Sequence, residues 1–322
     1  MRRFTFYRTF YPVLNKDTPV TVGFERVSRR ILAEIKGYKH VWMHSGNWWN
    51  LKPEERSPSK IISSLKKLAK VCNVDGIMSL NIPPRLYGKY YDIWNYPREL
   101  RHEALENSLR LSLELRELLD LDIPIYCCYE VGRFDDALEW YKRASEVGFT
   151  EFGAGFAGFL RGRPLPQAYE RIVEVIVAAR VACGPDIKFH ASGVGSLRLL
   201  ALVFYVGATS ADGSTPIRAA LANRTVYDLR GKAFKVDEIK TWSCECGFCE
   251  GRKPRELIDL FKKSYSARVL HNSIVWDEFI RRIIEVYNEG TYEDFLESLM
   301  KSRTYLKAYR YAKELLRKFK LM

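Results

Sequence analysis

The stretch from Ile187 to Asp212, IKFHASGVGSLRLLALVFYVGATSAD, decides the fold class. It begins with a β-prone run, Ile187 to Ser192, and passes through a glycine turn into an apolar helical run, Leu197 to Val206. It then returns to a second β-prone run, Ala208 to Asp212. Two short β-prone runs joined by one helix are typical of a βαβ unit with parallel strands. The stretch therefore predicts a parallel sheet covered by helices.

The same alternation extends toward the N-terminus. One helix is expected after Ser57, with that serine as its N-cap and Pro58 at its first position. Further helices are expected at Arg98 to Leu119, Phe134 to Gly148 and Gln167 to Cys183, and further strands at Val20 to Phe24, His40 to His44, Asp75 to Asn81, Ile123 to Tyr129 and Phe149 to Gly155. We place an eighth strand between Phe234 and Cys244. No glycine-rich first turn of an open doubly wound sheet is visible, so we predict a closed (β/α)8 barrel, the TIM-barrel fold.

After Trp242 the β-prone runs stop and helical patterns take over. The expected helices are Pro254 to Ser264, Asn272 to Asn288, Tyr292 to Ser302 and Tyr305 to Phe319. We therefore divide the chain into a catalytic barrel domain, residues 1–240, and a zinc-binding helical C-terminal subdomain, residues 241–322.

The zinc prediction rests on Cys244, Cys246 and Cys249, with His271 farther along the chain. Three thiolates and one imidazole are the ligands that tetrahedral zinc favours, and four protein ligands leave no open position for a catalytic water. We expect a structural zinc ion. The alternatives are a redox-active thiol cluster and, for His271, an ordinary histidine at the start of the helix that follows it.

The composition indicates a soluble protein with a polyanionic partner. The formal net charge is +13, and the commonest use of such an excess is to bind nucleic acid. No run of about 18 apolar residues is present, so we expect no membrane span. Seven cysteines, an odd number with three packed together, suit metal binding in a reducing compartment, and we expect a cytoplasmic location.

The ligand set, the helix after it and the segment from His190 to Asp212 together resemble the tRNA-guanine transglycosylase family over residues 40 to 300. In that family a Gly-Val-Gly turn, here Gly193 to Gly195, precedes a helix and a strand that ends in the catalytic aspartate. Asp212 stands at that place, and the zinc cluster follows it. The resemblance implies a barrel whose site lies at the carboxyl ends of the strands, with Asp212 as the nucleophile. The alternative for Asp212 is a turn or helix-cap residue.

The resemblance implies exchange of a base in a nucleic acid: a carboxylate attacks the ribose anomeric carbon, the old base leaves, and a new base displaces the carboxylate. The chain departs from the family in the base pocket. His44 precedes Ser45 where the family has an aspartate, so we expect either a general acid/base or a structural histidine at this position. Asn81 and Glu130 stand where the family has a carboxylate and a carboxamide, which suggests an altered base preference. The substrate-binding residues expected on this resemblance are Ser45, Asn81, Glu130, Gly155, Phe156 and Gly193.

We therefore expect an enzyme, a pentosyltransferase that replaces a purine in a polynucleotide by a 7-deazapurine or related base. The polynucleotide is expected to be tRNA, with DNA as the alternative. A non-catalytic nucleic-acid-binding subunit is the alternative from another class of protein. The family often dimerises through its zinc region, and the apolar sides of the terminal helices would permit a homodimer.

Overall fold

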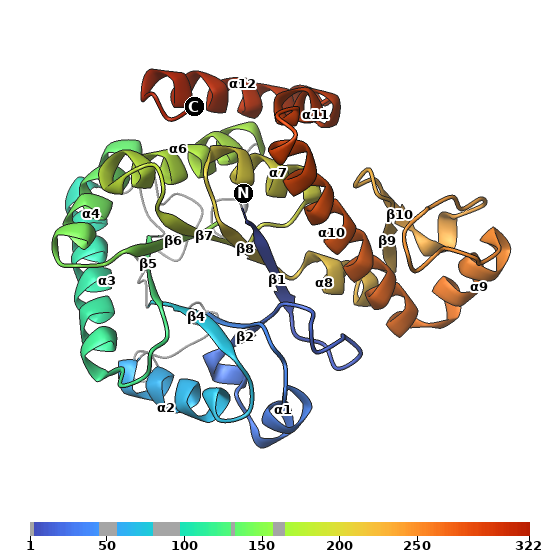
Figure 1. Cartoon of the computed structure of the whole chain (residues 1–322), viewed down its shortest axis with the longest axis horizontal. Helices are drawn as coiled ribbons and strands as arrows, with labels where there is room; N and C mark the ends of the chain where they lie inside the picture. Colours follow the sequence, from blue (N-terminus) through green and yellow to red (C-terminus); the bar gives the residue numbers. More distant parts are fainter. Residues whose placement is uncertain (1–2, 45–56, 80–96, 130–132, 157–164) are drawn as a thin grey trace.

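The computed structural model describes residues 3–44, 57–79, 97–129, 133–156 and 165–322 (Figure 1). Eight parallel strands form a closed barrel, in which each strand pairs with the next along the chain and the last pairs with the first. They are β1 (Thr5–Thr9), β2 (Val20–Gly23), β3 (Val41–His44), β4 (Val74–Met78), β5 (Ile125–Tyr129), β6 (Glu151–Gly155), β7 (Lys188–Ser192) and β8 (Ser210–Gly213). The predicted (β/α)8 barrel is confirmed.

The prediction of the eighth strand between Phe234 and Cys244 is wrong. The strand that completes the barrel is β1, which pairs with both β2 and β8. Its sequence, TFYRT, is β-prone, but the charged Arg8 makes it unlike the apolar run that is expected of a buried barrel strand. Residues Ala233–Lys235 instead form β10, which pairs antiparallel with β9 (Thr225–Tyr227) in a separate two-stranded sheet.

Every helix predicted around and after the barrel has a counterpart among the described helices, which also include two that were not predicted, Arg29–Glu34 and Thr215–Leu221. The described helices are α1 (Arg29–Glu34), α2 (Pro58–Ala69), α3 (Arg98–Leu118), α4 (Phe134–Glu146), α6 (Leu165–Cys183), α7 (Leu197–Val206), α8 (Thr215–Leu221), α9 (Pro254–Lys263), α10 (Tyr265–Asn288), α11 (Tyr292–Leu299) and α12 (Arg303–Lys318). Figure 1 shows α2, α3, α4, α6, α7 and α8 around the barrel and α12 lying along α6. Among the described residues, no helix is both long and apolar enough to span a bilayer.

Aromatic side chains fill the middle of the barrel. Tyr7, Trp42, Met78, Tyr126 and Cys128 form a buried cluster of their own, apart from the main core between the strands and the helices. The His190 ring stacks on Trp42 with 3.9 Å between ring centroids. This packed layer makes a rigid floor below the carboxyl ends of the strands.

Helix α10 is fastened to the barrel by buried polar contacts. Arg8, fully buried on β1, donates to the Ser273 carbonyl oxygen at 2.9 Å and forms an ion pair with Asp277. The Asn272 side chain accepts a hydrogen bond from the Tyr227 backbone amide and donates to two carbonyl oxygens, those of Pro216 and Thr225. Every polar atom of that carboxamide is therefore used, which fixes α10 against α8 and β9.

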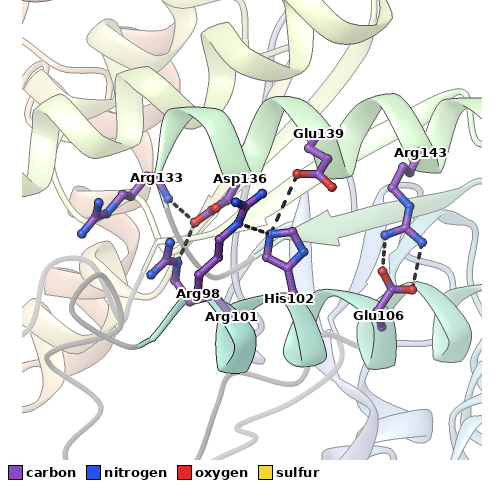
Figure 2. A network of polar contacts seen from close by, with 8 residues as sticks. All are labelled: Arg98, Arg101, His102, Glu106, Arg133, Asp136, Glu139 and Arg143. Atoms are coloured by element: carbon purple, nitrogen blue, oxygen red, sulfur yellow. Dashed lines mark hydrogen bonds and ion pairs between the residues drawn. The ribbon is translucent and has the colours of Figure 1, made fainter.

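Helices α3 and α4 are joined by a network of polar contacts, among them two arginine–carboxylate ion pairs of different character (Figure 2). Arg101 Nε lies 2.6 Å from Asp136 Oδ2, and the two side chains are only 8% and 9% exposed. Arg143 and Glu106 form the second pair in a much more exposed position, at 41% and 50%. A buried pair depends on both partners because neither charge can be solvated alone.

We expect Asp136→Ala to lower the free energy of unfolding by about 3–5 kcal/mol, because Arg101 would stay buried without that carboxylate. Glu106→Ala is the matched control, for which we expect a loss of about 1 kcal/mol or less. Urea unfolding followed by circular dichroism measures both. Equal losses in the two variants would contradict the assignment of the buried pair.

Candidate active site and metal centre

Several of the predicted site residues lie at the carboxyl ends of the barrel strands. His44 is the last residue of β3, Gly155 is the last of β6, and Asp212 is next to last in β8. Since parallel strands of a barrel end at one mouth, these residues lie around the same opening. Ser45, Asn81 and Glu130 lie outside the described residues.

Asp212 is held by the glycine turn that follows β7. Its Oδ1 atom accepts hydrogen bonds from the Gly193 amide at 2.7 Å and the Ser192 hydroxyl at 2.8 Å. Gly193 has φ +80°, a left-handed conformation that glycine adopts without strain. A Cβ atom at Gly213 would lie 2.3 Å from the Val194 carbonyl oxygen, so a glycine is needed for the turn to approach β8. The turn thus fixes the carboxylate in one orientation.

His190 lies on the other side of the carboxylate, fully buried inside the barrel. Its Nε2 atom is 3.9 Å from Asp212 Oδ2, and its Nδ1 atom is 2.9 Å from the Ser210 hydroxyl. Burial lowers the pKa of His190 below its ordinary value, although Asp212 opposes this. The imidazole is therefore neutral near pH 7, and a Ser210 hydroxyl that donates to Nδ1 leaves the Nε2 proton directed at Oδ2.

The Asp212 carboxyl ionises readily in spite of its burial. Burial alone would raise its pKa, but His190, His44 and the Gly193 amide together hold it below the ordinary value. The side chain is only 7% exposed. A buried, ionised carboxylate with one oxygen held by two donors can act as an oriented nucleophile.

The other predicted base-pocket residues divide into two groups. The Gly193 amide faces Asp212, as described, and Gly155 pairs with Ser192 at the strand ends. The Phe156 ring is fully buried in the main hydrophobic core, so in this structure it cannot stack on a base without moving. Sequence reasoning gave no role to His190 and Ser192. Their spacing is the signal that could have identified them, since positions two apart on a strand face the same side.

Cys244, Cys246, Cys249 and His271 form a cluster in which all four ligand atoms lie within 4.8 Å of one another. His271 Nδ1 is 3.4 Å from Cys246 Sγ and 3.5 Å from Cys249 Sγ. Tetrahedral zinc, with bonds of about 2.3 Å to sulfur and 2.0–2.1 Å to nitrogen, would separate these atoms by about 3.6 Å. The cluster can therefore bind a metal ion.

Surrounding groups orient these ligands. His271 Nε2 lies 2.8 Å from the Tyr227 carbonyl oxygen, which fixes the ring with Nδ1 toward the cysteines. The Trp242 indole donates to Cys249 Sγ at 3.5 Å. Burial acts to lower the pKa of His271. Cys246 and Cys249 raise it to about 9, because their hydrogen bonds and negative charge favour the protonated imidazole. The helix that was expected to begin at Asn272 begins earlier, because α10 starts at Tyr265 and contains His271.

We expect the purified protein to contain one tightly bound metal ion per chain, and Cys246→Ser to lose it. Cys72→Ser is the matched control, because burial raises the pKa of this thiol to about 12 and it lies outside the cluster. Mass spectrometry of the metals in each preparation tests this. Retention of the metal by Cys246→Ser would contradict the ligand assignment.

The closed barrel, the buried carboxylate at its mouth and the Cys3His cluster define a (β/α)8-barrel protein with a candidate metal site. No family model matches the chain. It is similar to the tRNA-guanine(15) transglycosylases of Pyrococcus abyssi (27% identical over 236 residues, 71% of this chain), Thermococcus kodakarensis (24% over 232 residues, 71%) and Methanocaldococcus jannaschii (23% over 264 residues, 80%). These matches support a relationship to the tRNA-guanine transglycosylase family. The matched parts span only 38%, 39% and 38% of those relatives' own lengths.

Proposed function

We propose that this protein exchanges a base in a polynucleotide, as a pentosyltransferase, through a covalent intermediate on Asp212. The observation that carries the proposal is the state of this carboxylate: it is buried, its pKa is lowered, and Oδ1 is fixed by Ser192 and Gly193. Oδ2 is the oxygen left to react, since its described neighbour is His190 Nε2 at 3.9 Å.

In the proposed reaction Asp212 Oδ2 attacks the ribose C1′ atom from the face opposite the base. A C1′–O bond forms as the C1′–N bond breaks, and the leaving purine takes its electron pair and a proton. A nitrogen of the incoming base then attacks C1′, expels the carboxylate and releases a proton. Two displacements retain the configuration at C1′, as in a retaining glycosidase.

His44, at the end of β3, is the group that we propose for the proton transfers. It lies close enough to Asp212 to help lower the pKa of that carboxyl. An imidazole can donate a proton to the leaving base and accept one from the incoming base near neutral pH. His190 is fully buried below Asp212 and is assigned a positioning role instead.

We propose tRNA as the polynucleotide and a purine or 7-deazapurine as the base. The name that the relatives share, tRNA-guanine(15) transglycosylase, supports tRNA as the polynucleotide. The net charge of +13 suits any polyanion. The choice of incoming base would depend on Ser45, Asn81, Glu130 and Gly155. We propose that Asn81 and Glu130 alter this choice, because they stand where the family has a carboxylate and a carboxamide.

We also propose that the ion of the Cys3His cluster is zinc and that its role is structural. Four protein ligands fill a tetrahedral shell, so the ion would join the loop of Cys244 to Cys249 to helix α10. The division into a barrel of residues 1–240 and a subdomain of residues 241–322 belongs to the same proposal.

The proposal is tested by trapping. With bulk tRNA and a 7-deazaguanine, we expect a denaturant-stable protein–RNA adduct that falls by a factor of about 10⁴ or more in Asp212→Asn. Asp135→Asn, at an exposed aspartate in the first turn of α4, is the control and should keep wild-type adduct. An adduct with duplex DNA alone would favour the DNA-acting alternative. Binding without an adduct in any combination would favour a non-catalytic subunit.

The pH dependence tests the role of His190. His190 helps keep the pKa of Asp212 low, so His190→Phe should raise that pKa. Because the nucleophile must be deprotonated, the fall in the rate of adduct formation at low pH, its acid limb, should then begin at higher pH. His190→Gln keeps an N–H donor near the same place and should move the limb back. Single-turnover rates between about pH 3 and pH 8 measure both. An acid limb that moves equally in the two variants would contradict the assigned role.

A further inference from the structure

A basic groove runs along the outside of the barrel, between α7, α10 and α11 and below the turn from β9 to β10. It encloses about 740 Å³. Six basic side chains from four parts of the chain line it: Arg198, Arg230, Lys232, Arg281, Arg282 and Lys301. Because these cations converge from separate elements, the fold itself concentrates positive charge here.

The acidic side chains of the groove do not cancel this charge. Two of the lining residues are acidic, and both accept hydrogen bonds from backbone amides. Asp228 accepts from the Arg230 and Lys232 amides at 2.9 Å, and Glu278 accepts from the Gly247 amide at 2.6 Å. Glu285 on the same helix also pairs with Arg281 and Arg282, but the six lining cations still outnumber these three carboxylates, so the groove presents an excess of cations to an occupant.

The floor of the groove is apolar and partly aromatic. Phe279 and Phe295 lie with ring centroids 6.1 Å apart, and Phe234 carries Lys232 Nζ 4.8 Å above its ring. Aromatic faces beside guanidinium and ammonium groups suit a ligand with both planar rings and negative charge. Nucleotides have this chemistry, whereas an acidic peptide has only the charge.

The groove also adjoins the candidate active site along the chain. Arg198 lies in the first turn of α7, which starts directly after the turn that carries Gly193. On the other side, a Cβ atom at Gly231 in the β9–β10 turn would meet Leu197 at 3.4 Å, so this turn packs on the start of α7. The start of α7 therefore joins the two places, since it follows the turn that holds Asp212 and supplies Arg198 to the groove.

We propose that this groove binds the phosphodiester backbone of the polynucleotide substrate, at a place separate from the site of base exchange. The choice of a nucleic acid rests on the proposed function. Arg281 and Arg282, adjacent on the exposed side of α10, would contact phosphates, and the partly exposed rings of Phe234 and Phe295 would receive a base, whereas Phe279 is buried beneath them.

The test compares Arg281→Glu with Arg110→Glu. Both arginines are exposed, at 68% and 64%, and both pair with a glutamate four residues later, but Arg110 lies on α3, away from the groove. Binding of bulk tRNA is followed by fluorescence anisotropy at several salt concentrations. We expect Arg281→Glu to weaken binding roughly 10-fold and to reduce the slope of log K against log salt by about 1, while Arg110→Glu changes neither.

A second measurement, the rate of adduct formation, separates this proposal from the proposed function. At saturating tRNA, Arg281→Glu should form the Asp212 adduct at the wild-type rate, because the groove takes no part in the chemistry. Equal tRNA binding by Arg281→Glu and the wild type would overturn the groove and leave the function of Asp212 untouched. Displacement of tRNA from the wild type by polyglutamate at equal charge would overturn it in favour of an acidic protein partner. A wild type that binds no polynucleotide would overturn both proposals.

Discussion

The pairing of β8 with β7 on one side and β1 on the other fixes the position of Asp212. Tyr7 on β1 lies opposite it, and the Gly193 turn from β7 supplies the amide that holds its Oδ1 atom. A shift of β8 by one residue would turn every side chain of the strand to its other face, so both ladders must keep this register. The geometry of the candidate site is thus a consequence of barrel closure, and the buried His190 beneath it is part of the same packed interior.

Helix α10 connects this barrel to the metal cluster and to the basic groove. Near one end His271 faces the three cysteines, and Asn272 and Arg8 bind the helix to the rest of the protein through buried hydrogen bonds. Farther along, Arg281 and Arg282 line the groove. In the structural role that we propose for it, a metal ion that orders the loop beside α10 would stabilise the surface that we assign to the polynucleotide.

The fold could be predicted from the sequence because βαβ units are local patterns. The helix from Leu197 to Val206 has the bounds that were expected. The strand at Thr5–Thr9 was missed because the partner that buries Arg8, the carboxylate of Asp277, lies far away in the sequence. The four metal-site residues form the cluster that their types and spacing predicted. The hydrogen bonds of Asp212 could not be predicted in this way, because they depend on how a turn with positive φ packs against a neighbouring strand.

The most direct test of the central claim is to locate the covalent bond. The trapped protein–RNA complex would be digested with nuclease and protease, and the modified peptide identified by mass spectrometry. The account predicts that the ribose remnant is attached to the Asp212 carboxylate and that no other residue of that peptide is modified. A remnant on His44 or on any other side chain would contradict it, because the buried and oriented carboxylate would then not be the nucleophile.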